Sequence, residues 1–340
     1  MRKVKVEDAV GMVLCHDITK VVPGEFKGPA FKKGHIVKQE DVEELLKLGK
    51  DHIYIWECGN ELLHENDAAL RMAEAAIGEG VEYAQPSEGK VNITAAGPGL
   101  LKVNVEALNE INMIDEISFA TQHTNRVVEQ GDIVAGTRAI PLVVGKEKIE
   151  AMEKICAGRG PVVEVKEIRK LKVGLLTTGN EVYFGRIKDK FSPVVKKKMA
   201  QFGCEVVWHE LAYDDADLIK EKIQGFIRQG AQIVITTGGM SVDPDDVTPS
   251  GVKGTGAELI AYGAPVLPGA MFLLAYLGDV PILGLPACVM YYKATVFDLV
   301  LPRVLAGERI TRQEIARMGH GGLCMSCKEC RYPVCPFGKY

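Results

Sequence analysis

The stretch AQIVITTGGMSVDPDDVTP, residues 231–249, decides the fold. Its apolar start is typical of a β-strand that is buried on both faces, and its polar end is typical of a loop. Similar apolar runs occur as KVGLLTT (172–178) and VPILGLP (280–286), and amphipathic helices such as DADLIKEKIQGFIRQG (215–230) separate them. This alternation predicts an α/β domain in which helices cover both faces of a doubly wound, mostly parallel sheet.

The chain before this domain has a different texture. Short strands interrupted by glycine, among them GKVNITAAGPGLLKVN (89–104) and GDIVAGTRAIPLVV (131–144), predict a β-rich accessory region with a few helices. We therefore expect four parts along the chain. They are an N-terminal β/α segment (1–60), the β-rich accessory region (61–168), the α/β domain (169–310) and a cysteine-rich tail (311–340).

The composition excludes several classes of partner. The 340 residues carry 41 Lys and Arg against 45 Asp and Glu, a net charge of −4, which provides no basic surface for nucleic acid or anionic lipid. No apolar run reaches the roughly 18 residues of a membrane span, and the start MRKVKVEDAVGM lacks the apolar core of a secretory signal. We expect a cytoplasmic protein with no nucleic-acid partner and no membrane partner.

Three polar segments follow predicted strands of the α/β domain. They are TTGNE (177–181), TTGGMSVDPDDVTP (236–249) and GLPACVMYYK (284–293). In sheets of this kind, ligands bind outside the carboxyl ends of the strands. We therefore expect these three segments to meet at one edge of the sheet and to form the binding site.

The second of these segments has the composition of a phosphate-binding turn. Gly238 and Gly239 allow positive φ and a close approach of backbone N–H groups to an anion, and Thr237 and Ser241 add hydroxyl donors. The alternative is that the two glycines only make a tight turn.

Acidic residues come directly after this turn. Asp243, Asp245 and Asp246 are close enough in sequence to repel one another unless water or a cation screens them. Mg²⁺ shared with a bound phosphate is the usual solution, because it takes a few carboxylate oxygens and several waters. The alternative is that one aspartate caps the next helix while the others face solvent.

Further charged residues follow the other strands. We expect one of Asp214 and Asp215 to cap the helix that they precede, and the other to reach the site. Glu181 is a third source of carboxylate, although an exposed loop glutamate is the simpler interpretation. Lys293 is expected near the start of a long last helix over 288–305, where it faces either an anion or solvent.

Residues 170–310 resemble the molybdopterin-binding domain that molybdenum insertases (molybdopterin molybdenumtransferases) share with molybdopterin adenylyltransferases. TTGNE stands where the insertases have Thr-Gly-Asp-Glu, TTGGMSV and DDVTP match in order, and GLPACV is similar to their Gly-Leu-Pro-Gly-Asn-Pro. LPGAMFLLAYL (267–277) is similar to their Lys-Pro-Gly-Lys-Pro segment, and residues 1–165 resemble their N-terminal region more faintly.

The resemblance implies the molybdopterin-binding fold and the roles of particular residues. It aligns Glu181, Asp214 and Asp246 with carboxylates that take part in catalysis. It also implies that molybdopterin or adenylylated molybdopterin is the ligand, that Mg²⁺ assists, and that molybdate or tungstate replaces AMP. The residues expected to bind the cofactor are Thr178, Gly179, Thr237, Gly238, Gly239, Ser241, Asp243, Thr248, Gly284 and Pro286.

Several residues depart from the insertase pattern. Asn180 replaces an acidic residue, Ala287 and Cys288 replace Gly-Asn, and the Pro-Gly-Ala-Met run lacks a lysine. The insertases' last β domain has no counterpart in this sequence. We therefore expect an oligomeric transferase of molybdenum-cofactor biosynthesis, with two alternatives. One is a non-catalytic molybdopterin carrier, sensor or delivery factor, and the other is a hydrolase of nucleotide pyrophosphates.

The sequence ends in a segment with four cysteines, GGLCMSCKECRYPVCPFGKY. Cys324, Cys327, Cys330 and Cys335 have the spacing C-x2-C-x2-C-x4-C, one residue longer before the last cysteine than the bacterial ferredoxin run. Thiolates this close repel one another unless they are protonated or hold a metal. We expect an iron–sulfur cluster or Zn²⁺ there, with unmetallated redox thiols as the alternative. We also expect an acceptor molybdoenzyme to dock on this tail.

Overall fold

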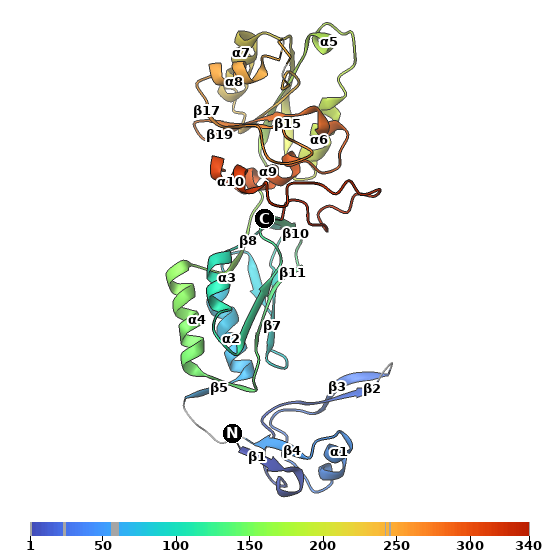
Figure 1. Cartoon of the computed structure of the whole chain (residues 1–340), viewed down its shortest axis with the longest axis vertical. Helices are drawn as coiled ribbons and strands as arrows, with labels where there is room; N and C mark the ends of the chain where they lie inside the picture. Colours follow the sequence, from blue (N-terminus) through green and yellow to red (C-terminus); the bar gives the residue numbers. More distant parts are fainter. Residues whose placement is uncertain (1, 23–24, 56–60, 242, 245, 340) are drawn as a thin grey trace. The chain divides into compact units, whose positions relative to one another are not determined.

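The computed structural model describes residues 2–22, 25–55, 61–241, 243, 244 and 246–339. The chain forms two compact units (Figure 1). Unit 1 comprises Met1–Ala96, Val103–Gln122 and Gln130–Glu164, and unit 2 comprises Gly97–Lys102, His123–Glu129 and Val165–Tyr340. The chain therefore passes between the two units more than once.

The start of unit 1 is a small β/α module. Its elements are β1 (Arg2–Lys5), a 3-10 turn (Val6–Asp8), β2 (Ile18–Val22), β3 (Phe26–Phe31), α1 (Asp41–Lys47) and β4 (His52–Ile55). β1 pairs antiparallel with β4, and β2 pairs antiparallel with β3. Buried apolar side chains form its core, among them Val6, Leu14, Leu45 and Ile53.

The rest of unit 1 is a four-stranded antiparallel sheet with helices on one face (Figure 1). Its elements are β5 (Leu62–His64), α2 (Glu65–Ala76), β6 (Val81–Tyr83), β7 (Lys90–Ala95), α3 (Val105–Ile111), β9 (Ile117–Thr121), β11 (Ile133–Ala139), β12 (Val143–Gly145) and α4 (Lys146–Arg159). The strand order is β6-β7-β11-β9, and α2 packs on β7 and β11. Val91 and Ile93 of β7 are buried while Asn92 between them is not, as expected of a sheet covered on one face.

A separate three-stranded sheet has the order β10-β8-β13. Its strands are β8 (Gly99–Val103), β10 (Arg126–Val128) and β13 (Val163–Lys166).

Unit 2 is built on a six-stranded sheet of order β15-β14-β16-β19-β18-β17. Its strands are β14 (Lys172–Thr178), β15 (Glu205–Ala212), β16 (Ile233–Thr237), β17 (Glu258–Tyr262), β18 (Leu273–Leu277) and β19 (Val280–Leu285). β15, β14, β16 and β19 are parallel, and at one side β18 pairs antiparallel with β19 and β17 pairs antiparallel with β18. The predicted α/β fold with a mostly parallel sheet is confirmed.

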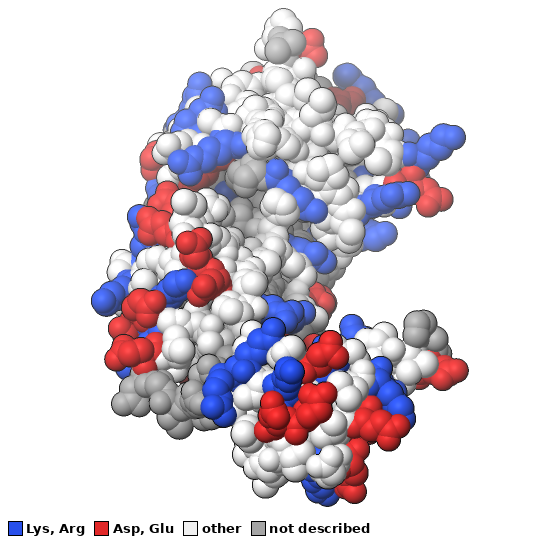
Figure 2. All heavy atoms as spheres, turned by 60° about the horizontal axis from the view of Figure 1, so that its bottom comes forward, with Lys and Arg blue, Asp and Glu red and all other residues white. Residues whose placement is uncertain are grey.

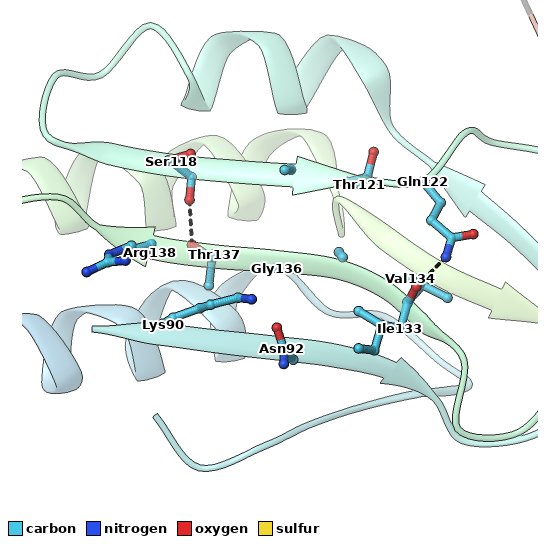
Figure 3. Close-up of a pocket in the computed structure, with 12 residues that line it drawn as sticks. Lys90, Asn92, Ser118, Thr121, Gln122, Ile133, Val134, Gly136, Thr137 and Arg138 are labelled. Atoms are coloured by element: carbon cyan, nitrogen blue, oxygen red, sulfur yellow. Dashed lines mark hydrogen bonds between the residues drawn. The ribbon is translucent and has the colours of Figure 1, made fainter. Parts of the chain in front are cut away.

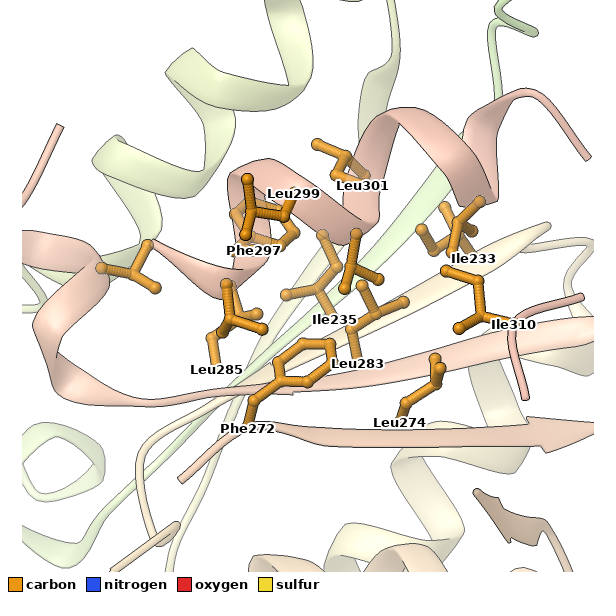
Figure 4. Close-up of a cluster of buried hydrophobic side chains, with 14 of the residues drawn as sticks. Ile233, Ile235, Phe272, Leu274, Leu283, Leu285, Phe297, Leu299, Leu301 and Ile310 are labelled. Atoms are coloured by element: carbon orange, nitrogen blue, oxygen red, sulfur yellow. The ribbon is translucent and has the colours of Figure 1, made fainter. Parts of the chain in front are cut away.

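Helices cover both faces of this sheet. They are α5 (Asn180–Tyr183), α6 (Phe191–Ala200), α7 (Ala216–Arg228), α8 (Thr248–Gly254), a 3-10 turn (Ala287–Met290), α9 (Val296–Leu305) and α10 (Arg312–Arg317). Leu175 of β14 packs in the cluster with α6 and α9, whereas its neighbour Leu176 packs in the cluster with α7 and α8. Figure 4 shows the first cluster, in which Phe297 and Leu299 of α9 lie over the strands.

The expected long helix over 288–305 is wrong. A 3-10 turn occupies Ala287–Met290, and α9 begins only at Val296. The reason is a capping box, in which Thr295 caps the helix and its backbone N–H donates to the Asp298 carboxylate over 2.7 Å. Lys293 therefore lies in the connection before α9 and not within a helix.

The surface view in Figure 2 shows basic and acidic side chains interspersed on the visible face. This distribution is in keeping with the small net charge of −4. Every helix among the described residues is too short or too polar to cross a membrane.

Candidate functional site

The three predicted segments follow strands whose carboxyl ends lie side by side. Thr177 of β14 is in register with Thr237 of β16, and Thr237 is in register with Leu285 of β19. Because these strands are parallel, the chain leaves each of them at the same edge of the sheet. We call this the carboxyl edge.

The glycine turn after β16 fits closely against the end of β14. Gly238 and Gly239 have φ values of +88° and +57°, which residues with a side chain rarely adopt. A Cβ atom at Gly238 would lie 2.1 Å from the Thr178 carbonyl oxygen, and one at Gly239 would lie 2.5 Å from Thr248 Oγ1. Both glycines are thus required by packing and by backbone conformation.

The threonines at this edge are buried and bonded to one another. Thr178 Oγ1 lies 2.9 Å from Thr248 Oγ1, and Thr237 Oγ1 donates to Thr177 Oγ1 over 3.3 Å. Thr178, Thr237 and Thr248 are each at most 2% exposed. Their hydroxyls therefore bond the strand ends and the start of α8 to one another. Of the hydroxyls predicted to bind the ligand's phosphate, that of Ser241 is exposed.

A reciprocal pair of hydrogen bonds ties the loop after β14 to the loop after β15. The Asn180 N–H donates to Asp214 Oδ2 over 2.9 Å, and the Asp214 N–H donates to Asn180 Oδ1 over 3.3 Å. Asp215, not Asp214, caps α7, because its carboxylate accepts from the Leu218 N–H over 2.8 Å. Of the two aspartates, Asp214 is therefore the one that lies at the carboxyl edge without capping the helix. Glu181 is exposed beside Gly179.

The acidic loop after the glycine turn is held by hydrogen bonds between two of its own residues. The Asp243 N–H donates to Asp246 Oδ2 over 3.2 Å, and the Asp246 N–H donates to the Asp243 carbonyl over 2.9 Å. Neither aspartate caps α8, which begins without a side-chain cap, and Asp245 lies outside the described residues. Asp243 is exposed and Asp246 is half-buried.

Tyr262 holds this loop from β17. Its hydroxyl donates to the carbonyls of Met240 and Ser241 over 3.0 and 3.2 Å. Burial, together with the negative charge of Asp246, raises the pKa of Tyr262. The tyrosine therefore stays a hydrogen-bond donor at neutral pH and holds the two carbonyls at 240–241.

The end of β19 completes the edge. Gly284 has little room for a side chain, because a Cβ there would lie 2.9 Å from Cβ of Leu273 as well as 2.7 Å from Cε of Met240. Pro286 is buried, whereas Ala287 and Tyr291 after it are exposed. The Lys293 carbonyl accepts from Lys198 Nζ over 3.0 Å, and Lys198 also pairs with Asp298.

Sequence reasoning missed a polar network beneath the carboxyl edge. Thr177 Oγ1 donates to Asp189 Oδ2 over 3.1 Å and lies 3.3 Å from His209 Nε2, and Lys196 Nζ lies 3.3 Å from His209 Nδ1. Burial and the Lys196 charge lower the pKa of His209 despite the neighbouring Asp189. The sequence did hold one signal, because Asp189 is of a residue type that often caps helices and stands just before α6. Its carboxylate accepts a hydrogen bond from the Phe191 N–H over 2.7 Å.

The donor set at the carboxyl edge suits Mg²⁺ shared with a ligand. Among the described residues, no three or more His, Cys, Asp or Glu side chains are gathered to hold a metal ion. Mg²⁺ is normally bound by one or two carboxylates together with substrate phosphates and water. The exposed Asp243 and half-buried Asp246 have the chemistry for such a shared ion.

The four tail cysteines are not gathered as metal ligands in the described part of the chain. Cys327 and Cys330 are exposed, whereas Cys324 and Cys335 are half-buried and pack against the unit 2 core. A metal site in the tail therefore stays a prediction.

A groove of about 380 Å³ lies elsewhere, on the sheet of unit 1 (Figure 3). β7, β9 and β11 line it, with Lys90 and Arg138 in register across two strands. None of the described residues predicted for the site from the sequence is part of its lining.

Two family models match parts of the chain. Residues 174–306 match the family described as "Probable molybdopterin binding domain", and residues 3–57 match a family described as a domain of unknown function. The first match includes all three segments of the carboxyl edge. The resemblance predicted from the sequence is confirmed for this stretch.

Curated relatives of the chain are named molybdopterin molybdenumtransferase. The protein from Synechococcus elongatus is 27% identical over 182 residues, which cover 48% of this chain and 45% of that protein. The protein from Haemophilus influenzae is 30% identical over 217 residues, or 59% of this chain and 51% of that protein. The protein from Staphylococcus epidermidis is 23% identical and covers 83% of this chain and 65% of that protein. The chain thus spans about half to two thirds of the length of these relatives.

Solved structures also match in part. The molybdopterin biosynthesis enzyme MoaB from Thermus thermophilus covers 41% of this chain and 98% of that chain, at 22% identity and a TM-score of 0.33. The tungsten cofactor synthesizing protein MoaB from Pyrococcus furiosus covers 35% of this chain and 84% of that chain, at 19% identity and a TM-score of 0.30.

Proposed function

We propose that the chain is a molybdenum-cofactor biosynthesis protein that binds molybdopterin or adenylylated molybdopterin at the carboxyl edge of unit 2. In the proposed reaction, molybdate or tungstate takes the place of AMP. An oxygen of the metal oxyanion bonds to the molybdopterin phosphorus as the phosphoanhydride bond of the adenylylated ligand breaks, and AMP leaves with its own phosphate. Glu181, Asp214 and Asp246 are the proposed catalytic carboxylates.

The observation that supports this proposal most is the meeting of three loops at one sheet edge. Gly238 packs against Thr178, and Asn180 exchanges hydrogen bonds with Asp214. These residues lie within the stretch that matches the molybdopterin-binding family. The family match and the geometry therefore point to the same part of unit 2.

The residues of the edge suit a phosphate ester. Ser241 and the backbone of the glycine turn would donate hydrogen bonds to the ligand's phosphate. Mg²⁺ held by Asp246 and by phosphate oxygens would neutralise the charge that develops on departing AMP. Asp214 accepts from the Asn180 N–H and so would keep the loop after β14 in position while Glu181 faces the ligand.

Further parts of the proposal concern assembly and delivery. We infer a homo-oligomer from the likeness to the family, and a metal or cluster in the tail from the spacing of its four cysteines. An acceptor molybdoenzyme would then dock through the tail and receive the finished cofactor.

The test is AMP release from adenylylated molybdopterin by the full chain after molybdate and Mg²⁺ are added. The Asp246→Asn variant should release AMP about 100-fold more slowly, because it removes a negative ligand for Mg²⁺. Asp279→Asn is the matched control, since Asp279 lies in the exposed turn before β19, at the opposite end of that strand. Equal release by the Asp246→Asn variant would contradict the role of Asp246. Binding of the ligand without release by the unaltered chain would instead identify a carrier or sensor.

A further inference from the structure

An exposed aromatic cluster borders the carboxyl edge. Tyr183 and Phe184 follow Glu181 after β14, and Tyr213 directly precedes Asp214 after β15. The three rings are between 37% and 60% exposed. Leaving this much aromatic surface in water forgoes stabilisation that burial would give, so the position of the rings beside two proposed catalytic carboxylates suggests a role in binding.

The three rings have the arrangement of a slot. The Phe184 and Tyr213 rings are nearly parallel, at 23°, with centroids 6.4 Å apart. Tyr183 is edge-on to both, at 5.3 Å and 89° from Phe184 and at 5.2 Å and 70° from Tyr213. The two parallel rings act as walls and Tyr183 as the base. Their 6.4 Å separation is shorter than the roughly 7 Å that a flat ring needs between two aromatic faces, so the exposed walls must move apart by about 0.6 Å to admit one.

The backbone fixes this slot to the proposed phosphate site. The hydrogen bonds between Asn180 and Asp214 join the two loops that carry the walls. The Tyr183 N–H donates to the Gly179 carbonyl over 2.9 Å, and the Phe184 N–H donates to the Asn180 carbonyl over 3.0 Å. The two loops are therefore held next to each other, while the exposed Phe184 and Tyr213 side chains can still rotate to admit a ring.

A cation contacts the aromatic cluster. The Arg186 guanidinium is 5.5 Å from the centre of the Phe184 ring, within the range of a cation–π contact. An exposed arginine beside stacked aromatic rings suits a ligand that combines a flat ring with a negative group. This charge favours a phosphorylated heterocycle over an uncharged apolar surface as the occupant.

We propose that Tyr183, Phe184 and Tyr213 form a stacking slot for a flat heteroaromatic ring whose attached phosphate is bound at the carboxyl edge. The inference rests on the proposed function and adds to it the residues that select the ring. Adenylylated molybdopterin offers two such rings, a pterin and an adenine, and the experiment must tell them apart.

The experiment measures binding of three probes to the full chain in the presence of Mg²⁺. Pterin represents one ring, AMP the other, and inorganic pyrophosphate represents the phosphates without any ring. In Phe184→Ala and Tyr213→Ala, the probe whose ring occupies the slot should bind about 5- to 100-fold more weakly, which is the range for loss of one stacking contact. Pyrophosphate should bind these variants as it binds the unaltered chain.

Two further variants separate stacking from other roles. Tyr213→Phe keeps the ring and removes the hydroxyl, so it should bind the ring probe normally. Tyr54→Ala removes a similarly exposed tyrosine in unit 1 and should change nothing. Phe184→Ala is safe for folding, because 60% of the Phe184 side chain surface is exposed.

Several results would overturn the slot. They are failure of both ring probes to bind the unaltered chain, equal ring binding by the alanine variants, or an equal loss of pyrophosphate and ring binding. A change in oligomeric state of Phe184→Ala without a change in ring binding would assign the cluster to a subunit contact instead. The proposed function has a separate failure, in which pyrophosphate does not bind or binds Asp246→Asn equally well.

Discussion

The carboxyl edge of unit 2 and the cysteine tail differ in what holds their functional side chains. At the edge, the candidate groups are tied to the sheet by the Asn180–Asp214 pair, by the glycine turn and by the Asp243–Asp246 loop. In the tail, the four cysteines are exposed or half-buried and are not gathered as ligands within the described chain. A site at strand ends is organised by the fold, whereas ligands on a terminal loop are brought together by what they bind.

The tail is nevertheless anchored to unit 2. Phe337 is 4% exposed and belongs to the unit 2 core, and its ring lies 6.1 Å from that of Tyr332. The Tyr332 hydroxyl donates to the Asp298 carbonyl of α9 over 3.2 Å, and burial raises the pKa of this tyrosine. The Cys324 N–H donates to the Leu267 carbonyl over 2.8 Å. These anchors leave the segment with Cys327 and Cys330 exposed.

The largest effect should be the loss of tail-bound metal in Cys327→Ser. A four-cysteine site that loses one thiolate should retain less than about a tenth of its iron or zinc. Metal analysis of the purified chain measures this, with Cys15→Ser as the control because Cys15 is buried in unit 1. Pyrophosphate binding at the carboxyl edge should not change. Metal retained in full by Cys327→Ser would contradict a tail metal site.

The next effect concerns the rigidity of the edge. Gly238→Ala places a Cβ 2.1 Å from a backbone oxygen at a φ of +88°, so we expect a loss of about 3 kcal/mol or more in the free energy of unfolding. Gly256→Ala is matched in φ, at +85°, but meets no atom within 4 Å, and should cost only about 1 kcal/mol. Urea unfolding of both variants measures the difference. Equal losses of unfolding free energy would mean that the glycine turn can shift to accommodate a Cβ. The carboxyl edge would then be less rigid, relative to the tail, than we infer.

Sequence patterns predicted the sheet of unit 2 well, because short, continuous apolar runs separated by amphipathic helices are typical of strands buried on both faces. They also placed Gly238 and Asp214 at strand ends, where parallel topology brings them to one edge. The capping box at Thr295 and Asp298, which begins α9 at Val296 and so shortens the expected helix, was readable from its spacing but was missed.

Other features of the site are contacts between residues that are distant in sequence, and a local sequence pattern does not predict such contacts. The contact of Thr177 with Asp189 and His209 joins three separate elements. The aromatic slot likewise needs the loops after β14 and β15 to be adjacent. Asp215 is the cap of α7 because its backbone is extended and its carboxylate meets the Leu218 N–H, and the sequence alone does not distinguish it from Asp214.

A smaller effect should follow from Thr178→Val at the base of the edge. The variant leaves the buried Thr248 hydroxyl without its 2.9 Å partner, which should cost about 1–3 kcal/mol. Thr19→Val is the control, because its 2.8 Å bond to Glu88 is exposed and should contribute less than about 1 kcal/mol. Thermal unfolding of the two variants compares a buried and an exposed hydroxyl. If both variants lost equally little stability, the buried threonine hydroxyls would not stabilise the carboxyl edge.

The smallest effect is the pH dependence that Asp189 contributes. Burial raises the pKa of Asp189, but hydrogen bonds from Ser192, Phe191 and Thr177 lower it by more, so the net shift is downward. A lowered carboxyl pKa adds stability above the unfolded pKa of about 3.9, and this stability is lost as pH falls through the folded pKa. Asp189→Ala should therefore cost about 1 kcal/mol at pH 7 and less at pH 3, measured by urea unfolding. A difference independent of pH would contradict this.

A crystal structure of the full chain with molybdopterin bound tests most directly whether the ligand binds at the carboxyl edge. We predict density for its phosphate beside Gly238, Gly239 and Ser241, at this edge of the six-stranded sheet. Density for the ligand in the groove of unit 1, or at the tail with the carboxyl edge empty, would contradict it.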